Sequence, residues 1–292
     1  MPDRVAVSRP EPPTARAGGP SRRRTGRLVT VVLALCSLAM VSPFAWELLT
    51  SLKSLGEATR VPPVLAPSEW RWANYGRVFD AVPFGHQFLN TVIVTVLRVA
   101  GQLLFCSLAA YAFARLKFRG SNVLFLLCLS ILMVPSQLYV IPQYQIMEYL
   151  GWLNSLKALT VPGLFSAFGV FLLRQFFLAL PRDLEDAARI DGCNPLQTYW
   201  YVMLPLVRPG LIALGVLTTI WSWNELLWPL IVNTDPEKMT LSAGLASLQG
   251  QRLTDFPVLM AGAIMASLPM ILLFSVMQRQ FIASIATTGV KG

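Results

Sequence analysis

Charged residues are scarce in this sequence of 292 residues. Lys, Arg, Asp and Glu make up 13% of the chain, whereas 54% of its residues are hydrophobic and the mean hydropathy is +0.56. A typical soluble domain carries about a quarter of its residues as charged side chains. The composition therefore excludes an ordinary soluble domain and predicts a protein that resides in a membrane.

Metal-binding and disulfide-forming side chains are equally few. The chain has one histidine, and its four cysteines, Cys36, Cys106, Cys128 and Cys193, include no CxxC pair. Three of the cysteines lie in apolar runs, where a thiol behaves as a small hydrophobic group. A disulfide framework and a metal site are therefore not expected.

Several catalytic motifs are missing as well. The chain contains no GxxxxGK[ST] loop with which it would bind ATP by itself, and neither an HExxH nor a GxSxG pattern occurs. The one histidine, His86, stands where a long apolar run begins. We therefore expect no catalytic residue and no directly bound cofactor, and a membrane-bound enzyme is the least supported interpretation.

Long apolar runs dominate what the sequence does contain. A membrane helix needs about 20 mostly apolar residues to cross the hydrocarbon core. Six runs meet this requirement and predict an all-α, polytopic membrane protein with six transmembrane helices. These runs comprise residues 28–48, 86–114, 121–145, 158–180, 209–232 and 257–278. Arg98 and Glu225 are the charged residues that lie in the middle of a run. Arg174 is close enough to the end of its run to reach the interface.

The distribution of basic residues predicts the orientation of the chain, because loops rich in Lys and Arg stay in the cytoplasm. With the N-terminus inside, the inner segments hold sixteen Lys and Arg residues and the outer segments hold seven. We therefore predict that both termini are cytoplasmic. The outer segment 49–83 is expected to form an ordered but irregular cap.

The first 27 residues form a segment rich in Pro and Arg with almost nothing to bury. We predict a disordered, basic cytoplasmic arm over residues 1–27 that attracts anionic lipid headgroups. The alternative is a cleaved signal peptide, since a basic segment before an apolar run is also its signature. Nucleic-acid binding is not expected, because no folded basic domain accompanies the arm.

The most polar stretch of the second half of the chain is residues 181–205, between the fourth and fifth runs. Its first part, LEDAARIDG (184–192), predicts a short helix with acidic residues at its N-terminal end and Gly192 at its C-terminal end. A second short helix, from about 195 to 203, is predicted to stop at Pro205. Two short helices joined by a glycine turn would form a compact knob suited to a partner's groove. A solvated connector between two spans is the alternative interpretation.

The same stretch resembles the EAA loop of ABC importer permeases, in which Glu-Ala-Ala is followed by Gly and then by Ile-x-Leu-Pro. The corresponding residues here are Asp186, Ala187, Ala188, Gly192, Val202, Leu204 and Pro205. Asp186 is shorter than the family's glutamate, so the preceding Glu185 would make the salt bridge in its place. Three further stretches, LAAYAFARLKFRG (108–120), SWNELLWPLIV (222–232) and the closing TTGVKG, resemble maltose-type carbohydrate permeases. The resemblance covers residues 28–292.

This resemblance implies a transport subunit of the type I importer permease fold in a bacterial plasma membrane. In that family two permease subunits form the pathway, two ATPase subunits bind beneath them, and an extracytoplasmic binding protein delivers the solute, which also implies a contact with the outer segment 49–83. ATP and Mg²⁺ would be used by the ATPase subunits alone. Transmission of the ATPase motion would fall to the coupling residues Glu185, Asp186, Ala187, Ala188, Gly192 and Pro205.

The implied substrate is a sugar or an oligosaccharide. Glycerol phosphate or another polyol derivative is the alternative within the family. Outside it, an ion-coupled secondary carrier is the alternative, and such a carrier would transport without any partner.

Polar and aromatic residues inside the apolar runs are candidates for the translocation path. They are Arg98, Gln137, Trp221, Trp223, Asn224, Glu225 and Trp228. Aromatic faces with hydrogen-bonding neighbours suit a sugar, although tryptophans also fill gaps between helices. Arg98 and Glu225 either line or gate the path, or they form a buried structural pair, or Arg98 faces the second permease. Gln143 and Tyr144 are further candidates, because two nearby prolines predict a kink that would frame a cavity.

Overall fold

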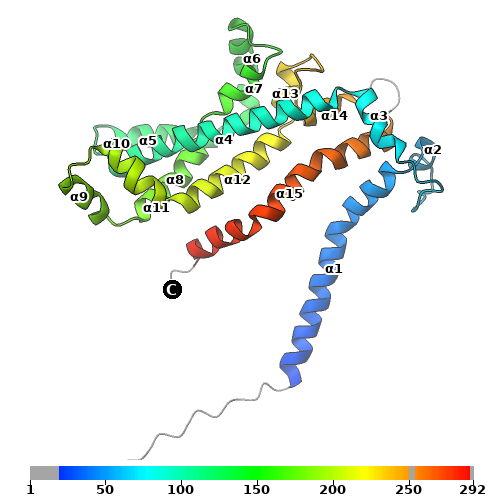
Figure 1. The fold of residues 1–292 in the computed structure, drawn as a ribbon, viewed down its shortest axis with the longest axis horizontal. Helices are drawn as coiled ribbons and strands as arrows, with labels where there is room; N and C mark the ends of the chain where they lie inside the picture. Colours follow the sequence, from blue (N-terminus) through cyan, green and yellow to red (C-terminus); the bar gives the residue numbers. More distant parts are fainter. Residues whose placement is uncertain (1–19, 250–253, 290–292) are drawn as a thin grey trace, which may run out of the picture. The chain divides into compact units, whose positions relative to one another are not determined.

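The computed structural model describes residues 20–249 and 254–289, which form helices joined by turns and loops (Figure 1). By contacts the chain divides into a short unit, Met1–Glu47, and a large unit, Leu48–Gly292. The all-α architecture predicted from the sequence is confirmed for the described residues.

The short unit contains most of α1 (Pro20–Ser51), whose stretch Val29–Ser51 has a mean hydropathy of 2.0. The helix begins at Pro20, so its first residues belong to the arm that we predicted to be disordered. Arginine is a good helix former and proline favours the first helical turn, which explains why the helix extends beyond the apolar run. Residues 1–19 of the predicted arm lie outside the described residues.

Four stretches of the described residues are long and apolar enough to cross a membrane without a sharp bend. They are Val29–Ser51, Phe84–Arg115, Leu156–Ala179 and Phe256–Val276. Two pairs of helices add to this number if each pair is one span: Ser121–Met133 with Ser136–Tyr149, bent by 97°, and Pro195–Leu206 with Arg208–Asn224, bent by 77°. The described residues therefore supply between four and six spans.

The third predicted span is interrupted. It contains α5 (Ser121–Ser130), the 3₁₀ turns η1 (Ile131–Met133) and η2 (Ser136–Tyr139), and the start of α6 (Val140–Tyr149). The break falls at Val134, which is extended with φ −95° and ψ 118°. A residue before proline avoids the helical conformation, and Pro135 follows Val134 directly.

The fifth predicted span, 209–232, is also divided in two. Helix α12 (Arg208–Asn224) ends at Glu225, which is extended with φ −66° and ψ 123°, and α13 (Leu227–Val232) follows. In an unbroken helix the ring of Pro229 would collide with the carbonyl group four residues earlier, which is that of Glu225. The break therefore gives proline a place in the first turn of a new helix.

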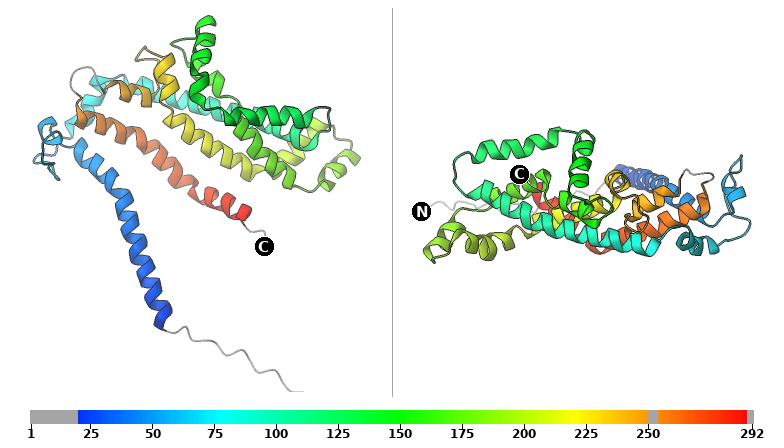
Figure 2. Two further views of the ribbon diagram at one scale, coloured as in Figure 1. Left: turned by 180° about the vertical axis from the view of Figure 1, so that it is seen from behind. Right: turned by 90° about the horizontal axis from the view of Figure 1, so that it is seen from above.

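Helix α4 (Phe84–Arg115) is central to the large unit and packs against both α8 (Ala167–Ala179) and α12 (Figures 1 and 2). Apolar residues of these helices form one core with residues that follow α9 (Asp183–Ile190). This core comprises Cys106, Ala110, Tyr111, Val170, Leu173, Phe177, Tyr199, Met203, Val207 and Leu214. It joins the predicted coupling segment to the membrane-spanning helices.

Two further clusters pack against other parts of α4. One combines the beginning of α4 with α3 (Ala73–Ala81), α14 (Leu241–Ser247) and α15 (Phe256–Gly289). The other combines α4 with α6, α7 (Leu156–Thr160) and α13, and the 3₁₀ turn η3 (Val161–Gly163) follows α7. Helix α15 extends to Gly289, beyond residue 278, where the sixth apolar run was predicted to end.

The predicted outer cap contains the short helix α2 (Leu55–Ala58), which begins with a capping box. The Glu57 amide donates to the Ser54 hydroxyl oxygen over 3.3 Å, and the Ser54 amide donates to the Glu57 carboxylate over 2.9 Å. Glu57 also accepts a hydrogen bond of 3.0 Å from the Ser68 amide and another from the Ser68 hydroxyl. Hydrogen bonds from Ser68 and Ser54 lower the pKa of the Glu57 carboxyl to about 2.

We expect this cap to keep its structure in mild acid. A depressed pKa contributes stability that is fully present above the unfolded-state pKa of about 4.3 and is lost progressively as the pH falls from there through the folded-state value. Limited proteolysis of residues 54–68 should therefore proceed at the same rate at about pH 7 and about pH 5.5 in the wild type, and faster at both in Glu57→Gln. Acceleration in the wild type at the lower pH would contradict the assignment.

Candidate functional site

A row of polar side chains occupies one face of α4 and points into the large unit. The buried members of this row are Gln87, Asn90, Thr91, Thr95, Arg98 and Gln102. Several of their partners are backbone groups at breaks or loops: the Gln102 side chain donates to the Gly163 carbonyl over 2.9 Å, and Asn90 donates to the Met239 carbonyl over 3.0 Å. Because a bilayer supplies no water to such carbonyls, the polar row of α4 stabilises interrupted helices at membrane depth.

Arg98 is the charged member of this row, and the structure brings it to Glu225. Its Nε donates to the Leu159 carbonyl over 2.8 Å, Nη2 donates to the same oxygen, and Nη1 forms an ion pair with the Glu225 carboxylate. Gly163 provides the space for the guanidinium, since a Cβ atom at this position would lie 2.5 Å from Arg98 Nε. Arg98 thus connects α4 both to α7, through the Leu159 carbonyl, and to the break between α12 and α13, through Glu225.

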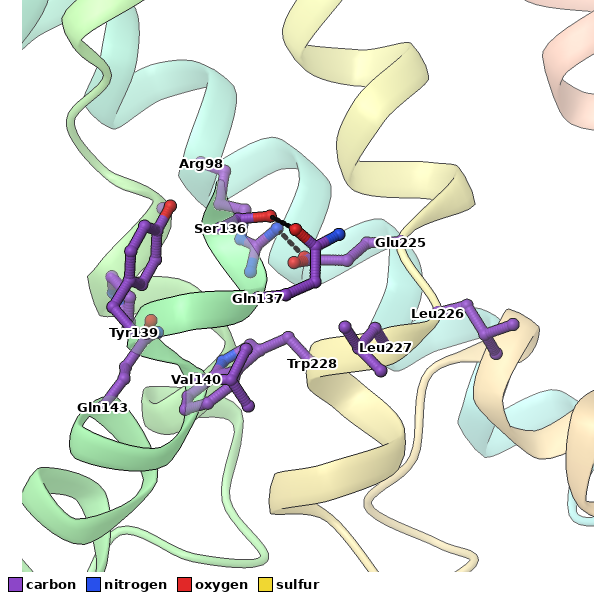
Figure 3. A pocket seen from close by; sticks show the side chains of 12 residues that line it. Arg98, Ser136, Gln137, Tyr139, Val140, Gln143, Glu225, Leu226, Leu227 and Trp228 are labelled. Atoms are coloured by element: carbon purple, nitrogen blue, oxygen red, sulfur yellow. Dashed lines mark hydrogen bonds and ion pairs between the residues drawn. The ribbon is translucent and has the colours of Figure 1, made fainter. Parts of the chain in front are cut away.

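A cavity of about 370 Å³ lies beside this ion pair (Figure 3). Its volume is within the range of about 300–1,000 Å³ that is typical of small-molecule sites. The polar residues that line it are Arg98, Ser136, Gln137, Tyr139, Gln143 and Glu225. A second cavity, of about 410 Å³, is also lined by Arg98 and Glu225, together with Gln102, Thr218, Trp221 and Asn224. The ion pair borders both cavities.

The predicted path residues lie in three places: along the first cavity, along the second cavity, and, for Trp223, away from both. The first cavity is lined by Arg98, Gln137, Glu225 and Trp228, and the second by Arg98, Trp221, Asn224 and Glu225.

Trp223 lies apart from both cavities: its Nε1 donates to the Ala266 carbonyl of α15 over 3.1 Å. Trp228 is 6% exposed, and its Nε1 donates to the Ala158 carbonyl over 2.9 Å, so its indole is held as a wall of the cavity. Tyr144 packs among apolar residues of α6, α7 and α13. The break at Glu225 changes the helical register, and for this reason the tryptophans before and after it do not share one face.

The predicted coupling segment folds into two helical pieces. The first, α9 (Asp183–Ile190), ends at Gly192, whose φ is +84°. The Cys193 amide donates to the Ala188 carbonyl over 2.9 Å, and the Gly192 amide donates to the Arg189 carbonyl over 3.0 Å. This pair of bonds is the Schellman arrangement, which favours glycine at the residue with positive φ.

The second piece consists of α10 (Pro195–Gln197), the π turn η4 (Thr198–Met203) and α11 (Leu204–Leu206). Pro205 therefore lies inside the helical stretch, and our prediction that the helix stops at this proline is wrong. Pro205 is the second residue of α11, and proline is tolerated in the first turn of a helix, where the backbone amides lack an intrahelical partner. The bend to α12 comes at Val207 instead, two residues later.

Buried side chains attach this segment to α4 and α8. The Glu185 carboxylate lies 3.4 Å from Arg115 Nε, and the two side chains are only 9% and 4% exposed. Arg115 also donates to the carbonyls of Phe177 and Leu180 at the end of α8, the latter over 2.6 Å. Farther along, the hydroxyl groups of Tyr199 and Ser107 are hydrogen-bonded over 2.6 Å.

The other predicted coupling residues differ in exposure. Asp186 is exposed and lies 3.7 Å from Arg189 in its own helix, so the buried ion pair is made by Glu185. Ala188 is buried, whereas Ala187 and Gly192 are exposed.

Sequence reasoning did not single out two of the attachment residues, Arg115 and Tyr199. A signal for Arg115 was present: it belongs to the stretch 108–120, at the end of the second apolar run, where a basic residue can meet the acidic loop. No comparable signal existed for Tyr199.

Residues 102–286 match the family described as binding-protein-dependent transport system inner membrane component. The arabinooligosaccharides transport system permease protein AraQ of Halalkalibacterium halodurans is 36% identical over 268 residues, which cover 91% of this chain and 96% of that protein. The sn-glycerol-3-phosphate transport system permease protein UgpE of Pectobacterium atrosepticum is 32% identical, with 86% and 92% covered. A chain in the crystal structure of a bacterial ABC transporter involved in the import of the acidic polysaccharide alginate superposes with a TM-score of 0.79 at 26% identity, covering 91% of this chain and 100% of that one.

Proposed function

The chain belongs to the family of binding-protein-dependent transport system inner membrane components, and from this premise we propose how it is driven and what it carries. It is a permease subunit of an ABC importer in the bacterial plasma membrane and not an enzyme. Our proposal is that a second six-span permease completes the pathway with it and that a binding protein delivers the solute. A pair of separate ATPase subunits, which use ATP and Mg²⁺, would move it through the segment α9–α11.

One observation carries the coupling proposal: this segment is anchored by buried groups but presents apolar side chains outward. Ile190, Leu196 and Tyr201 are 86%, 58% and 79% exposed. Large exposed apolar side chains on one short segment favour a protein contact, and the predicted orientation places this segment in the cytoplasm. A partner that binds these side chains would displace α4 and α8 as one body. Glu185 and Tyr199 bind the segment to Arg115 and Ser107 of α4, and Arg115 in turn is hydrogen-bonded to the end of α8.

For the solute we propose a sugar or an oligosaccharide. The relatives described above include a permease named for arabinooligosaccharides and one named for glycerol 3-phosphate, so the family alone leaves the chemical class open. The first cavity supports a sugar, because its amide and hydroxyl groups from Gln137, Tyr139 and Gln143 match a solute with many hydroxyl groups.

A charge placed on the outward face of α9 should uncouple the subunit. In Ala187→Lys we expect ATP-driven uptake to be lost and recovery of the ATPase in pull-downs to fall about tenfold, since a lysine would be forced into a close contact. Asn122→Lys, which adds the same charge at an exposed residue of α5 outside the coupling segment, is the control and should behave as the wild type. Normal uptake by Ala187→Lys, or transport by the purified chain without any partner, would refute the coupling proposal.

A further inference from the structure

The charge balance of the two cavities bears on the solute. Within the described part of the chain, the charged side chains that line either cavity are Arg98 and Glu225, and these form an ion pair with each other. The lining contributed by this subunit therefore has no net charge. An anionic solute would find no uncompensated cation here.

The two members of the pair are not equally accessible. The Arg98 side chain is 9% exposed, and its donors are directed to the Leu159 carbonyl and to the Glu225 carboxylate. The Glu225 side chain is 32% exposed, and its hydrogen bond to Arg98 involves Oε2. A solute in the cavity therefore meets the carboxylate more than the guanidinium.

Gly163 and Leu159 keep this arrangement in place. Because a Cβ at Gly163 would lie 2.5 Å from Arg98 Nε, the guanidinium is confined between the η3 turn and Glu225. Turning Arg98 toward an incoming anion would break its bonds to the Leu159 carbonyl and leave Glu225 without its counterion. Both losses are costly, because Arg98 and Leu159 are buried and only a third of the Glu225 side chain is exposed.

We propose that the first cavity is a contact site for uncharged, polyhydroxylated solutes and that Glu225 is a specificity-determining residue that disfavours carboxylate- or phosphate-bearing ones. The proposal rests on the importer function proposed above. The exposed carboxylate oxygen accepts hydrogen bonds from sugar hydroxyl groups, and Gln137 and Gln143 offer both donors and acceptors. An anionic solute instead brings a like charge next to Glu225, which produces discrimination by repulsion.

The test compares two probes of the same length and linkage: a β-1,4-linked glucose trimer and the corresponding glucuronate trimer, in which a carboxylate replaces the hydroxymethyl group of each sugar. Equilibrium binding of each is measured at millimolar concentration to the assembled importer in nanodiscs, without its binding protein, so that only the membrane subunits contribute. We expect the neutral trimer to bind the wild type about tenfold more tightly than the anionic trimer.

Glu225→Gln should bring the ratio of the two affinities close to one or reverse it, because Arg98 then has no counterion. The double change Arg98→Gln with Glu225→Gln restores a lining without net charge and should recover part of the preference for the neutral trimer. Gln137→Leu leaves the ion pair intact and should weaken binding of the neutral trimer. The matched control is Glu148→Gln, at an exposed glutamate of α6 that does not line the cavity, and its ratio should equal that of the wild type.

Three results would overturn the inference: equal affinity of the wild type for both trimers, no binding of either, or a ratio that Glu225→Gln leaves unchanged. ATP-driven uptake with the binding protein present is measured separately in the same preparations. If the wild type shows no ATP-driven uptake, the importer function itself is refuted. If the wild type shows uptake but Glu225→Gln leaves the ratio of the two affinities unchanged, only the role of Glu225 is refuted.

Discussion

Arg115→Leu is expected to abolish solute uptake by the assembled importer while the subunit still inserts into the membrane. The substitution removes the buried ion pair with Glu185 and the two hydrogen bonds to the end of α8. Losing one partner of a buried pair costs about 3–5 kcal/mol, because the other charge stays buried without compensation. Helix α9 would then lose its attachment to α4 and α8, although Tyr199 still holds the rest of the segment. ATP would still be hydrolysed, but the motion of α9 would not reach the membrane-spanning helices. Uptake and ATPase activity are measured in the same proteoliposomes.

Two further variants separate a coupling role from a stabilising one. The double change Arg115→Leu with Glu185→Leu removes both charges and should regain thermal stability relative to Arg115→Leu, yet uptake should remain lost because the connection is still absent. Arg119→Leu, at an exposed arginine in the same loop, is the control and should transport normally. Uptake that recovers together with stability in the double variant would show that the pair serves folding only.

Gly163→Ala is the second substitution for which we expect a large loss of transport, at least about tenfold, despite adding a single methyl group. The new Cβ would lie 2.5 Å from Arg98 Nε and 2.8 Å from its Cδ, closer than van der Waals contact allows. Arg98 would have to move away from the Leu159 carbonyl and from Glu225, leaving both without their donor. Uptake should fall about as far as it does in Arg98→Leu, because the same contacts are lost.

The matched control for this prediction is Gly215→Ala in α12. A Cβ at Gly215 would meet Val99 at 3.9 Å and Leu103 at 4.0 Å, which is ordinary contact, so transport should be unchanged. If Gly163→Ala takes up solute at the wild-type rate, the Arg98 side chain can move away from Glu225 without loss of function, and the ion pair is not needed for transport.

Much of the fold could be predicted because its determinants are local. Apolar runs of sufficient length identify the membrane-spanning segments, and the turn at Gly192 follows from the conformational freedom of glycine. The breaks were harder to predict. Proline was visible at positions 135 and 229, but hydropathy alone does not distinguish a continuous apolar helix from one interrupted at Val134 or Glu225.

The candidate site shows the same limit. The sequence offered Glu225 as a candidate partner of Arg98, because a charge inside an apolar run usually has a partner of opposite sign, but it left a role in the path and a contact of Arg98 with the second permease open. A salt bridge of Glu185 was predicted, but neither its partner Arg115 nor the contact of Tyr199 with Ser107 was identified, because partners on different helices depend on how those helices pack.

Hydropathy and turn chemistry are properties of neighbouring residues, so the sequence was sufficient to predict a helical membrane protein with a short polar helical segment that turns at Gly192. Which member of the ion pair is the more exposed to the cavity follows from the tertiary packing alone. Arg98 and Glu225 are separated by 127 residues, and their exposure depends on the close approach of Gly163 and on the break that Pro229 imposes. These are contacts among three separate segments, and their geometry exists only when α4, η3 and α12 pack together.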